Sequence, residues 1–399
     1  MNVFEFVFVS FLALNFCAQI TSMILLRRWR KLRPSKKLTN YPPLSVVTSL
    51  KGITPQTVGG LQCILRSEYS GEVEFVIVVS DADDPVLAIA RDVVVAENSK
   101  VNVTWVVGFR WQEAREGSRA LNPRSAKMAE GIARAKFDWI YWHAVDSWIK
   151  TDHLSEVMSQ VGANEANFAT SFPVIINTSE LGSVLEAAAL NVEVARFFLM
   201  SKIRKSACVV YGGSLLANRK LLAKGEGLVA TLNRLTDDAI LARAFAKTGA
   251  RCFLSCNAVY VPQAQETVRD FLKRQIRWLM IARYEMHSLF FSTLPFMLIP
   301  VGLVCGLAAV ASAERSSAVL TGTVAFVVFR GLEGIWFQRE LGTPRADYLK
   351  GAFVAVYDFI LPVLWLIALF KKRLDWAGDQ LIIGAGGQLL TSSQSVEVL

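Results

Sequence analysis

Histidine is scarce in this sequence, and its cysteines are scattered. His143, His153 and His287 are the only histidines, too few for a histidine cluster. Cys252 and Cys256 form a lone pair with neither a second cysteine pair nor a partnering histidine, so a structural zinc site is excluded. No disulfide framework is implied, which fits a main domain kept in the cytoplasm.

Two glycine-rich phosphate-binding motifs are also missing. The chain contains neither GxGxxG nor a Walker A motif, so dinucleotide and P-loop binding are not indicated. It has no nucleic-acid-binding motif either, although 43 Lys and Arg face 34 Asp and Glu, a formal net charge of +9. Because several of these cations flank apolar runs, they suit an anionic membrane face and a phosphate-bearing ligand better than DNA.

Apolar residues, in contrast, are abundant. The chain is 53% hydrophobic with a mean hydropathy of +0.36, which is high for a soluble protein and predicts a membrane protein. Residues 3–26 are long enough to span a bilayer, and the basic cluster 27–33 follows at once. We therefore expect an uncleaved anchor with its N-terminus outside and the basic cluster in the cytoplasm.

The C-terminal third contains further apolar runs. Those near 288–312 and 352–370 each have about the length of a span, whereas 317–335 is weaker because Arg330 and Glu333 lie inside it. If 317–335 spans, the basic residues after the last run end up outside, against the positive-inside bias. If it is re-entrant or interfacial, they stay inside, and the sequence leaves both arrangements open.

Short β-rich runs alternate with helix-length segments from residue 44 onward. This texture predicts a parallel α/β sheet, a Rossmann-like arrangement that binds ligands at the carboxyl ends of its strands. The predicted strands are 45–50, 73–79, 101–107 and 139–142.

Charged residues follow three of these strands. Lys51-Gly52 follows the first, the acidic string 81–85 the second, and Asp146 the fourth. A lone acid after a strand is usually a turn or cap residue, but two acidic strand ends at one sheet edge indicate a ligand. A sugar nucleotide explains them, because one acid can bind the base or ribose and another can hold Mg²⁺ or Mn²⁺ across the diphosphate.

Two predicted helices carry the remaining charged candidates. Thr236 is a plausible N-cap with Asp237 and Asp238 in the first turn; these acids either serve the helix dipole alone or supply a general base. A later helix, 268–279, has a cationic stripe that either lies on anionic lipid or, through Arg274, Arg277 and Trp278, holds the phosphates of a nucleotide.

Two further stretches are ambiguous. Residues 182–200 are apolar but broken by charged and amide residues, which predicts an interfacial or substrate-contacting helix, not a span. Residues 209–214 contain Gly212 and Gly213 and form either a close backbone approach to a ligand or a plain turn.

The order of these motifs resembles the ceramide glucosyltransferase family, membrane-anchored GT-A enzymes that pass a sugar from a nucleotide donor to a lipid. The likeness covers roughly residues 1 to 390. The strings that carry it are Lys51-Gly52, Asp81-Ala82-Asp83-Asp84-Pro85, Asn122-Pro123-Arg124, Asp146-Ser147, Asp237-Asp238 and Arg274-Gln275-Ile276-Arg277-Trp278.

The resemblance implies roles for individual residues. Asp238 is the general base of an inverting transfer, Asp81 lies near the nucleoside, and Asp146 meets the metal and the diphosphate. The donor-binding residues, the last three closing over the site, are Lys51, Gly52, Asp81, Asp83, Arg124, Asp146, Arg274, Arg277 and Trp278.

The chain departs from the family pattern at three positions. Asp237 replaces a Glu, Trp148 follows the Asp-Ser pair where relatives have Gly or Asp, and Val194 falls where ceramide-using animal enzymes carry a His. Trp148 leaves a single metal-binding acid and places an indole where the donor is expected. With Val194 in place of that His, the resemblance no longer specifies ceramide as the acceptor.

We therefore expect an integral membrane glycosyltransferase that moves a sugar, by the resemblance from a UDP-hexose, onto a lipid such as ceramide. Diacylglycerol, a hopanoid, a polysaccharide and a degenerate, non-catalytic role are the alternatives. The catalytic domain is expected in the cytoplasm, and a bacterial inner membrane is preferred over a eukaryotic endomembrane. The expected divisions are an anchor (1–26), a basic linker (27–43), a GT-A domain (44–265), an interfacial helix (266–287), a transmembrane region (288–375) and a tail (376–399).

Overall fold

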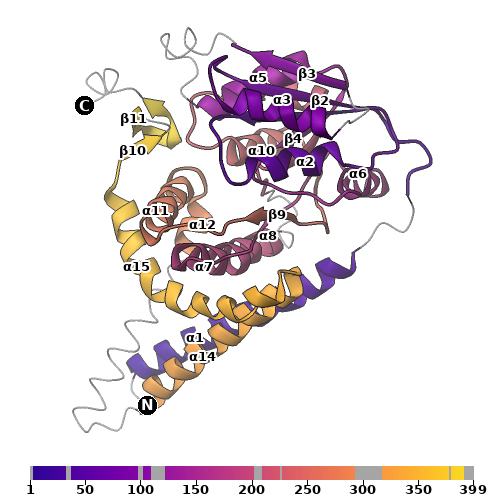
Figure 1. Cartoon of the computed structure of the whole chain (residues 1–399). Coiled ribbons are helices and arrows are strands. Elements are labelled where there is room, and N and C mark those ends of the chain that lie inside the picture. Colours follow the sequence, from indigo (N-terminus) through magenta and orange to yellow (C-terminus); the bar gives the residue numbers. More distant parts are fainter. Residues whose placement is uncertain are drawn as a thin grey trace. The chain divides into compact units, whose positions relative to one another are not determined.

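The computed structural model describes residues 3–32, 37–97, 102–108, 122–201, 209–224, 227–292, 317–376 and 379–390 (Figure 1). The apolar run expected near 288–312 lies for the most part outside these residues.

The chain forms two compact units. The sheet unit comprises Leu32–Pro173, Ser201–Pro262 and Lys372–Leu399, and the helical unit comprises Met1–Lys31, Val174–Met200 and Gln263–Lys371. The sheet unit thus covers most of the expected GT-A domain, without 174–200 and with the C-terminal segment added. The predicted domain boundaries themselves stay a prediction.

The sheet unit contains the predicted α/β sheet. Its strand order is β3-β2-β1-β4-β7-β5-β8. β1 pairs in parallel with β2 and β4, and β2 in parallel with β3, as predicted; β7 runs antiparallel to β4 and β5, and β5 pairs in parallel with β8. The strands are β1 (Leu44–Leu50), β2 (Val73–Val79), β3 (Asn102–Val107), β4 (Trp139–His143), β5 (Phe168–Thr170), β7 (Ser214–Asn218) and β8 (Cys252–Leu254).

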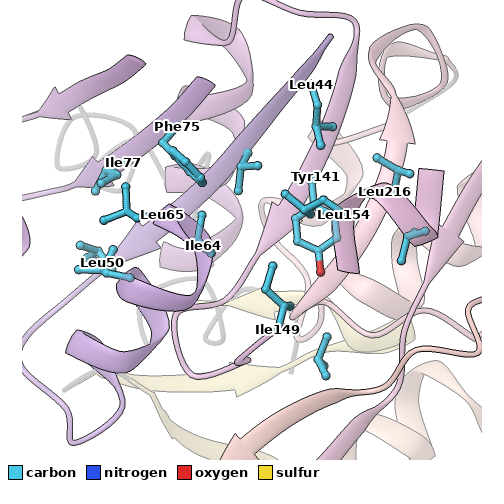
Figure 2. Close-up of a cluster of buried hydrophobic side chains, with 14 of the residues drawn as sticks. Leu44, Leu50, Ile64, Leu65, Phe75, Ile77, Tyr141, Ile149, Leu154 and Leu216 are labelled. Carbon is cyan, nitrogen blue, oxygen red and sulfur yellow. The ribbon is translucent and has the colours of Figure 1, made fainter. Parts of the chain in front are cut away.

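Helices cover both faces of this sheet, so its central strands are buried on both sides. Successive side chains of a strand point to opposite faces: Val46 joins one hydrophobic core and Val47 the other. Figure 2 shows the first core, in which Phe75 and Ile77 of β2 meet Ile64 of α2. The first core lies under α2 (Thr57–Leu65), α3 (Val86–Ala96) and α6 (His153–Ala163), the second under α5 (Pro123–Arg134), α9 (Arg219–Ala223) and α10 (Asp238–Lys247).

The remaining short elements of the sheet unit are η2 (Val229–Thr231), β9 (Val259–Pro262), β10 (Arg373–Trp376), β11 (Asp379–Ile383), η6 (Ala385–Gly387) and β12 (Leu389–Leu390). β10, β11 and β12 form an antiparallel sheet of their own, in that order.

The helical unit contains helices long and apolar enough to span a bilayer. By length and composition, three stretches of the described residues qualify: Phe8–Lys31, Leu320–Leu341 and Arg345–Phe370. The elements are α1 (Val3–Lys31), β6 (Pro173–Ile176), α7 (Leu181–Ala188), the π-helix η1 (Ala189–Val194), α8 (Ala195–Ser201), α11 (Val268–Glu285), α12 (His287–Ser292), α14 (Ser317–Leu341), η4 (Arg345–Asp347), η5 (Leu349–Phe353) and α15 (Val354–Phe370).

The predicted helix 182–200 is interrupted. A π-helical turn separates α7 from α8, and Asn191 inside it is buried, with its amide bonded to the backbone N–H and C=O of Ile175 at 2.8 and 2.9 Å. Much of this stretch is therefore packed inside the helical unit; its place at a membrane interface stays a prediction.

The charges that weaken 317–335 as a span are fully buried within α14. Arg330 forms a two-pronged ion pair with Asp358 of α15, at 2.7 and 3.0 Å, and a second with Glu333 at 2.5 Å. Glu193 of the π-helix also pairs with Arg330, and Arg196 pairs with Glu333 at 2.8 Å. The charges satisfy one another inside the helix bundle, which is how ionisable groups persist in apolar helices.

Substitution of Gly131 would test how closely α5 packs against the sheet. A Cβ on Gly131 of α5 would lie 2.5 Å from Val47 Cγ1 and 2.7 Å from Val78 Cγ2. Both neighbours are stiff β-branched residues in the core, so Gly131→Ala should lower the free energy of unfolding by about 1–3 kcal/mol.

The matched control is Gly162→Ala on α6, where the added Cβ meets only the tip of Leu38, 3.1 Å away. There the gain in helix propensity, about 0.5–1 kcal/mol, should offset the contact. Unfolding followed by circular dichroism in detergent compares the two; equal midpoints would contradict this packing.

Candidate active site

The candidate residues of the sheet unit gather at one edge of its sheet. β1, β2 and β4 are parallel and end at this edge, and β7 begins there, with Ser214 opposite His143. The segments after Leu50, Val79 and His143 and the segment before Ser214 therefore lie together, as the strand-end acids predicted.

The turn after β1 is held by a carboxylate that the sequence did not single out. Gly52, with φ of +61°, donates its N–H to Asp84 Oδ2 at 2.9 Å, and Asp84 Oδ1 also accepts from the first amide of α3, on Val86, at 2.9 Å. Asp84 is thus occupied by the backbone. The predicted donor-binding acids Asp81 and Asp83 are exposed, and so is Lys51, which leaves these three side chains accessible to a ligand.

A second residue that sequence reasoning missed lies behind this turn. The Lys127 ammonium is buried and donates to the Leu50 carbonyl at 3.1 Å. Burial, with the nearby charges of Lys51 and Arg124, lowers the pKa of Lys127 to about 8. The available signal was a lysine three residues after Arg124, in the helix-length segment before the predicted strand 139–142. Lys127 fixes the end of β1 and adds positive charge behind the site.

Arg124 and the acidic pair meet at one glycine, Gly212. Arg124 donates to the Gly212 carbonyl and pairs with Asp237 at 3.5 Å, while the Gly212 N–H donates to Asp238 Oδ2 at 3.3 Å. A Cβ on Gly212 would lie 3.0 Å from Asp237 and 3.2 Å from Arg124, so only glycine fits without displacing them. The stretch 209–214 forms a turn whose Gly212 contacts the acidic pair, and a close approach to a ligand there stays a prediction.

Helix α10 begins one residue later than expected. Asp237, not Thr236, is its N-cap, accepting from the Asp238 amide at 2.9 Å. The Thr236 hydroxyl donates instead to the Asp238 carboxylate, which also accepts from the Ala239 amide at 2.7 Å. The acids do serve the helix start, yet Asp238 is half-buried and not sealed from solvent.

The electrostatics distinguish Asp238 from an ordinary helix-start acid. Burial, together with the adjacent Asp237 charge, raises the pKa of Asp238 above its usual value, while Thr236 and Arg124 act in the opposite direction. A carboxylate with a raised pKa is the more basic one, and so suits proton abstraction.

Asp146 completes this group. Its carboxylate is exposed, and the buried Ser147 hydroxyl donates to it at 3.3 Å while lying 3.0 Å from the Tyr211 hydroxyl. Burial and the Asp146 charge raise the pKa of Tyr211, so the phenol stays protonated and available as a donor.

The Trp148 indole packs against α2. A Cβ on Gly59 would come within 2.2 Å of the ring, and the indole N–H donates to the Gln56 carbonyl at 3.3 Å. The backbone of Trp148 pairs with Tyr260. The glycine on α2 thus accommodates the ring, and an indole near the donor stays a prediction.

No three Asp, Glu, His or Cys side chains come together as a metal-binding group in the parts of the chain that the structure describes. A divalent cation nevertheless fits the chemistry, because Mg²⁺ and Mn²⁺ at phosphate sites commonly take one or two carboxylates plus phosphate oxygens and water. Asp146 is the exposed carboxylate that would hold it.

The predicted box Arg274, Arg277 and Trp278 lies on α11, in the helical unit. Arg274 is engaged: its guanidinium bonds both oxygens of Glu266 at 2.9 and 2.8 Å and lies 3.7 Å from Glu186. Arg277 makes no hydrogen bond or ion pair with any described residue. Burial and the charge of Arg274 lower the pKa of Arg277, while the charges of Glu186 and Glu266 act in the opposite direction.

Glu186 is a buried carboxylate that sequence reasoning left as a break in an apolar helix. It is fully buried, accepts from the Gln275 amide at 3.1 Å, and Gln275 in turn accepts from the Tyr357 hydroxyl at 3.0 Å. Burial raises the pKa of Glu186 to about 7, against the pull of Arg274. These contacts lock the inner face of α11 and leave Arg277 as the available half of the box.

Comparison with known proteins identifies the family and the fold. The profile described as glycosyl transferase family 21 matches residues 7–389. The mannosyltransferase PcManGT from Pyrobaculum calidifontis, solved with GDP-Man and Mn²⁺, aligns over 89% of this chain and 99% of its own, with a TM-score of 0.55 and 15% identity. Staphylococcus aureus TarS with UDP-GlcNAc covers 88% and 99%, at a TM-score of 0.38 and 11% identity, too low to add weight. The predicted GT-A fold is thereby confirmed.

The different surroundings of the two arginines can be tested without any ligand. Arg274→Gln leaves Glu186 and Glu266 buried without their cation and should lower the free energy of unfolding by about 1–3 kcal/mol, the lower part of the range for buried pairs because Arg274 is partly exposed. Arg277→Gln should leave it unchanged within about 0.5 kcal/mol.

Lys273→Gln, at an exposed position of the same helix, is the matched control. Thermal unfolding in detergent provides the comparison. A loss on Arg277→Gln as large as that on Arg274→Gln would show that both arginines serve the framework.

Proposed function

The chain belongs to glycosyl transferase family 21, and on this basis we propose that it transfers a sugar from a nucleotide donor to the hydroxyl of a membrane lipid. The observation that carries the proposal is the meeting of Asp238 and Arg124 at Gly212, at the carboxyl edge of the parallel strands, with Asp146 near enough for its charge to act on Arg124. Asp238 can take a proton, Arg124 can contact a polyphosphate, and Asp146 can hold a cation that binds it, as nucleotide-sugar chemistry requires.

Asp238 is the proposed general base. The lipid hydroxyl gives its proton to the Asp238 carboxylate as its oxygen attacks the anomeric carbon, and the bond from that carbon to the diphosphate breaks on the opposite face. A single displacement of this kind inverts the anomeric configuration. The raised pKa of Asp238 favours proton capture, and the Gly212 N–H and Thr236 hydroxyl keep the carboxylate in place.

The donor is proposed to lie along the turns after β1, β2 and β4. Lys51, Asp81 and Asp83 offer exposed polar groups for the nucleoside, and Arg124 adds positive charge beside the acidic pair. A divalent cation held by Asp146 would neutralise charge on the departing diphosphate. Arg277 and Trp278 are kept as donor contacts because the Arg277 guanidinium, which makes no hydrogen bond or ion pair with the described residues, can bind a phosphate.

A lipid acceptor is proposed because apolar helices of spanning length both precede and follow the main segments of the sheet unit along the sequence. These helices would keep the active site beside its substrate in the bilayer. Ceramide follows from the resemblance. Diacylglycerol and hopanoids keep the same chemistry, and the sheet unit is proposed to face the cytoplasm.

The main test replaces the base. In a host that lacks glycolipids and is supplied with ceramide, diacylglycerol and hopanoid, the intact chain should produce a new hexosyl or N-acetylhexosaminyl lipid by mass spectrometry. Asp238→Asn should reduce its formation about 10²–10⁴-fold, since the amide cannot take the proton. Asp92→Asn, an exposed acid on α3, is the control and should retain activity.

The same experiment names the acceptor from the mass of the product. No new lipid from the intact chain would favour a polysaccharide acceptor or a non-catalytic role. A product in undiminished yield from Asp238→Asn would remove Asp238 from catalysis.

The pH dependence tests the coupling between the two acids. The transfer rate should fall as pH drops through the raised pKa of Asp238, because protonation removes the base. Asp237→Asn takes away the charge that helps to raise this pKa, so the acidic limb of kcat against pH should move to lower pH. A limb that stays in place, or moves to higher pH, would assign the titration to another group.

A further inference from the structure

The C-terminal segment returns to the sheet unit after the last apolar helix and bonds to the chain just before the proposed base. The Leu389 N–H donates to the Asn233 carbonyl at 2.8 Å, and the Leu235 N–H donates to the Gly387 carbonyl at 3.1 Å. The Arg234 guanidinium also donates to the Gly386 carbonyl. Residues 233–235 are therefore paired, strand-like, with residues 386–389.

Glycines make this approach possible. Gly386 and Gly387 have φ of +62° and +78°, a region that other residues enter only with strain. The side chains of the segment are also anchored, since Leu381, Ile383 and Leu389 of β11 and β12 are buried. The segment is thus packed, not merely laid on the surface.

The other side of residues 232–234 is bonded to the start of α5. The Asn122 N–H donates to the Leu232 carbonyl at 2.8 Å, and its side-chain amide donates to the Arg234 carbonyl at 3.1 Å. The Asn122 side-chain oxygen caps α5 by accepting from the Arg124 and Ser125 amides, each at 3.1 Å. One short stretch therefore lies between the C-terminal segment and the residue that orients Arg124.

That stretch leads directly into Thr236, Asp237 and Asp238. The backbone of residues 232–235 therefore positions both sides of the site. It positions Arg124 through Asn122, and it positions Asp238 because the chain runs directly into that residue. A base must lie within hydrogen-bond reach of the proton it removes, and a displacement of about 1 Å can reduce a rate about 10²-fold.

We propose that residues 379–390 are a positioning element of the active site, which holds 233–235 and thereby sets the positions of Asp238 and Arg124. This inference rests on the proposed function, in which Asp238 is the base. It assigns a task in the sheet unit to a segment that the sequence indicated only as a tail.

The test uses the full chain with Leu389→Pro, which removes the amide donor to Asn233, and Arg234→Ala, which removes only the bond to Gly386. The control is Gln388→Ala, an exposed side chain between the bonded positions. We expect kcat to fall about 10-fold for Arg234→Ala and about 10²-fold for Leu389→Pro, with KM for the nucleotide sugar within about 3-fold. Gln388→Ala should match the parent.

Hydrogen exchange supplies a readout that does not depend on turnover. In Leu389→Pro the amides of Leu235 and Ala239 should exchange at least about 10-fold faster than in the parent, with the β1 and β2 amides unchanged. If the parent itself transfers no sugar, the proposed function fails, and the exchange result still decides whether the segment holds the Asp238 stretch.

Two results would overturn the inference. Kinetics and exchange like those of Gln388→Ala would show that the segment does not hold 233–238. A joint loss of thermal stability and donor affinity in both variants, with exchange faster throughout the sheet, would show that it serves only general folding.

Discussion

One residue, Gly212, joins the charged halves of the proposed active site. Its carbonyl accepts from Arg124 and its N–H donates to Asp238, so the backbone groups of a single residue hold both the cation and the acid. A side chain at this position would press on Asp237 and Arg124. Because the turn continues into β7, which pairs with β4, the register of these two strands helps to position Asp238 relative to Asp146.

Much of the sheet unit could be predicted because its signals are local. Runs rich in β-branched residues mark the strands, and acids directly after β2 and β4 mark the ligand edge, since parallel strands end together. Local pattern could not say which acid of 81–84 is committed to the backbone. Asp84 accepts a hydrogen bond from the Gly52 amide, thirty-two residues away, whereas Asp81 and Asp83 remain exposed.

The carboxylate partners of Arg274 could not be predicted from the sequence for the same reason. Glu186 lies about ninety residues before Arg274, inside an apolar stretch, and no spacing rule links them; only the packing of α7 against α11 does. The family resemblance treated Arg274 and Arg277 alike, but their surroundings differ, one paired with two carboxylates and the other free among the described residues. A π-helical turn between α7 and α8 is equally invisible to a 3.6-residue period.

The return of residues 372–390 to the sheet unit constrains how the chain is threaded through a bilayer. The chain leaves this unit after Pro262 and re-enters it at Lys372. If the chain spans a bilayer with the sheet unit on one side, the number of complete crossings between these residues would be even. At most two of the three apolar segments predicted there would then cross, and the basic residues after α15 would stay on the side of the sheet unit. That parity satisfies the positive-inside bias whenever the sheet unit is cytoplasmic.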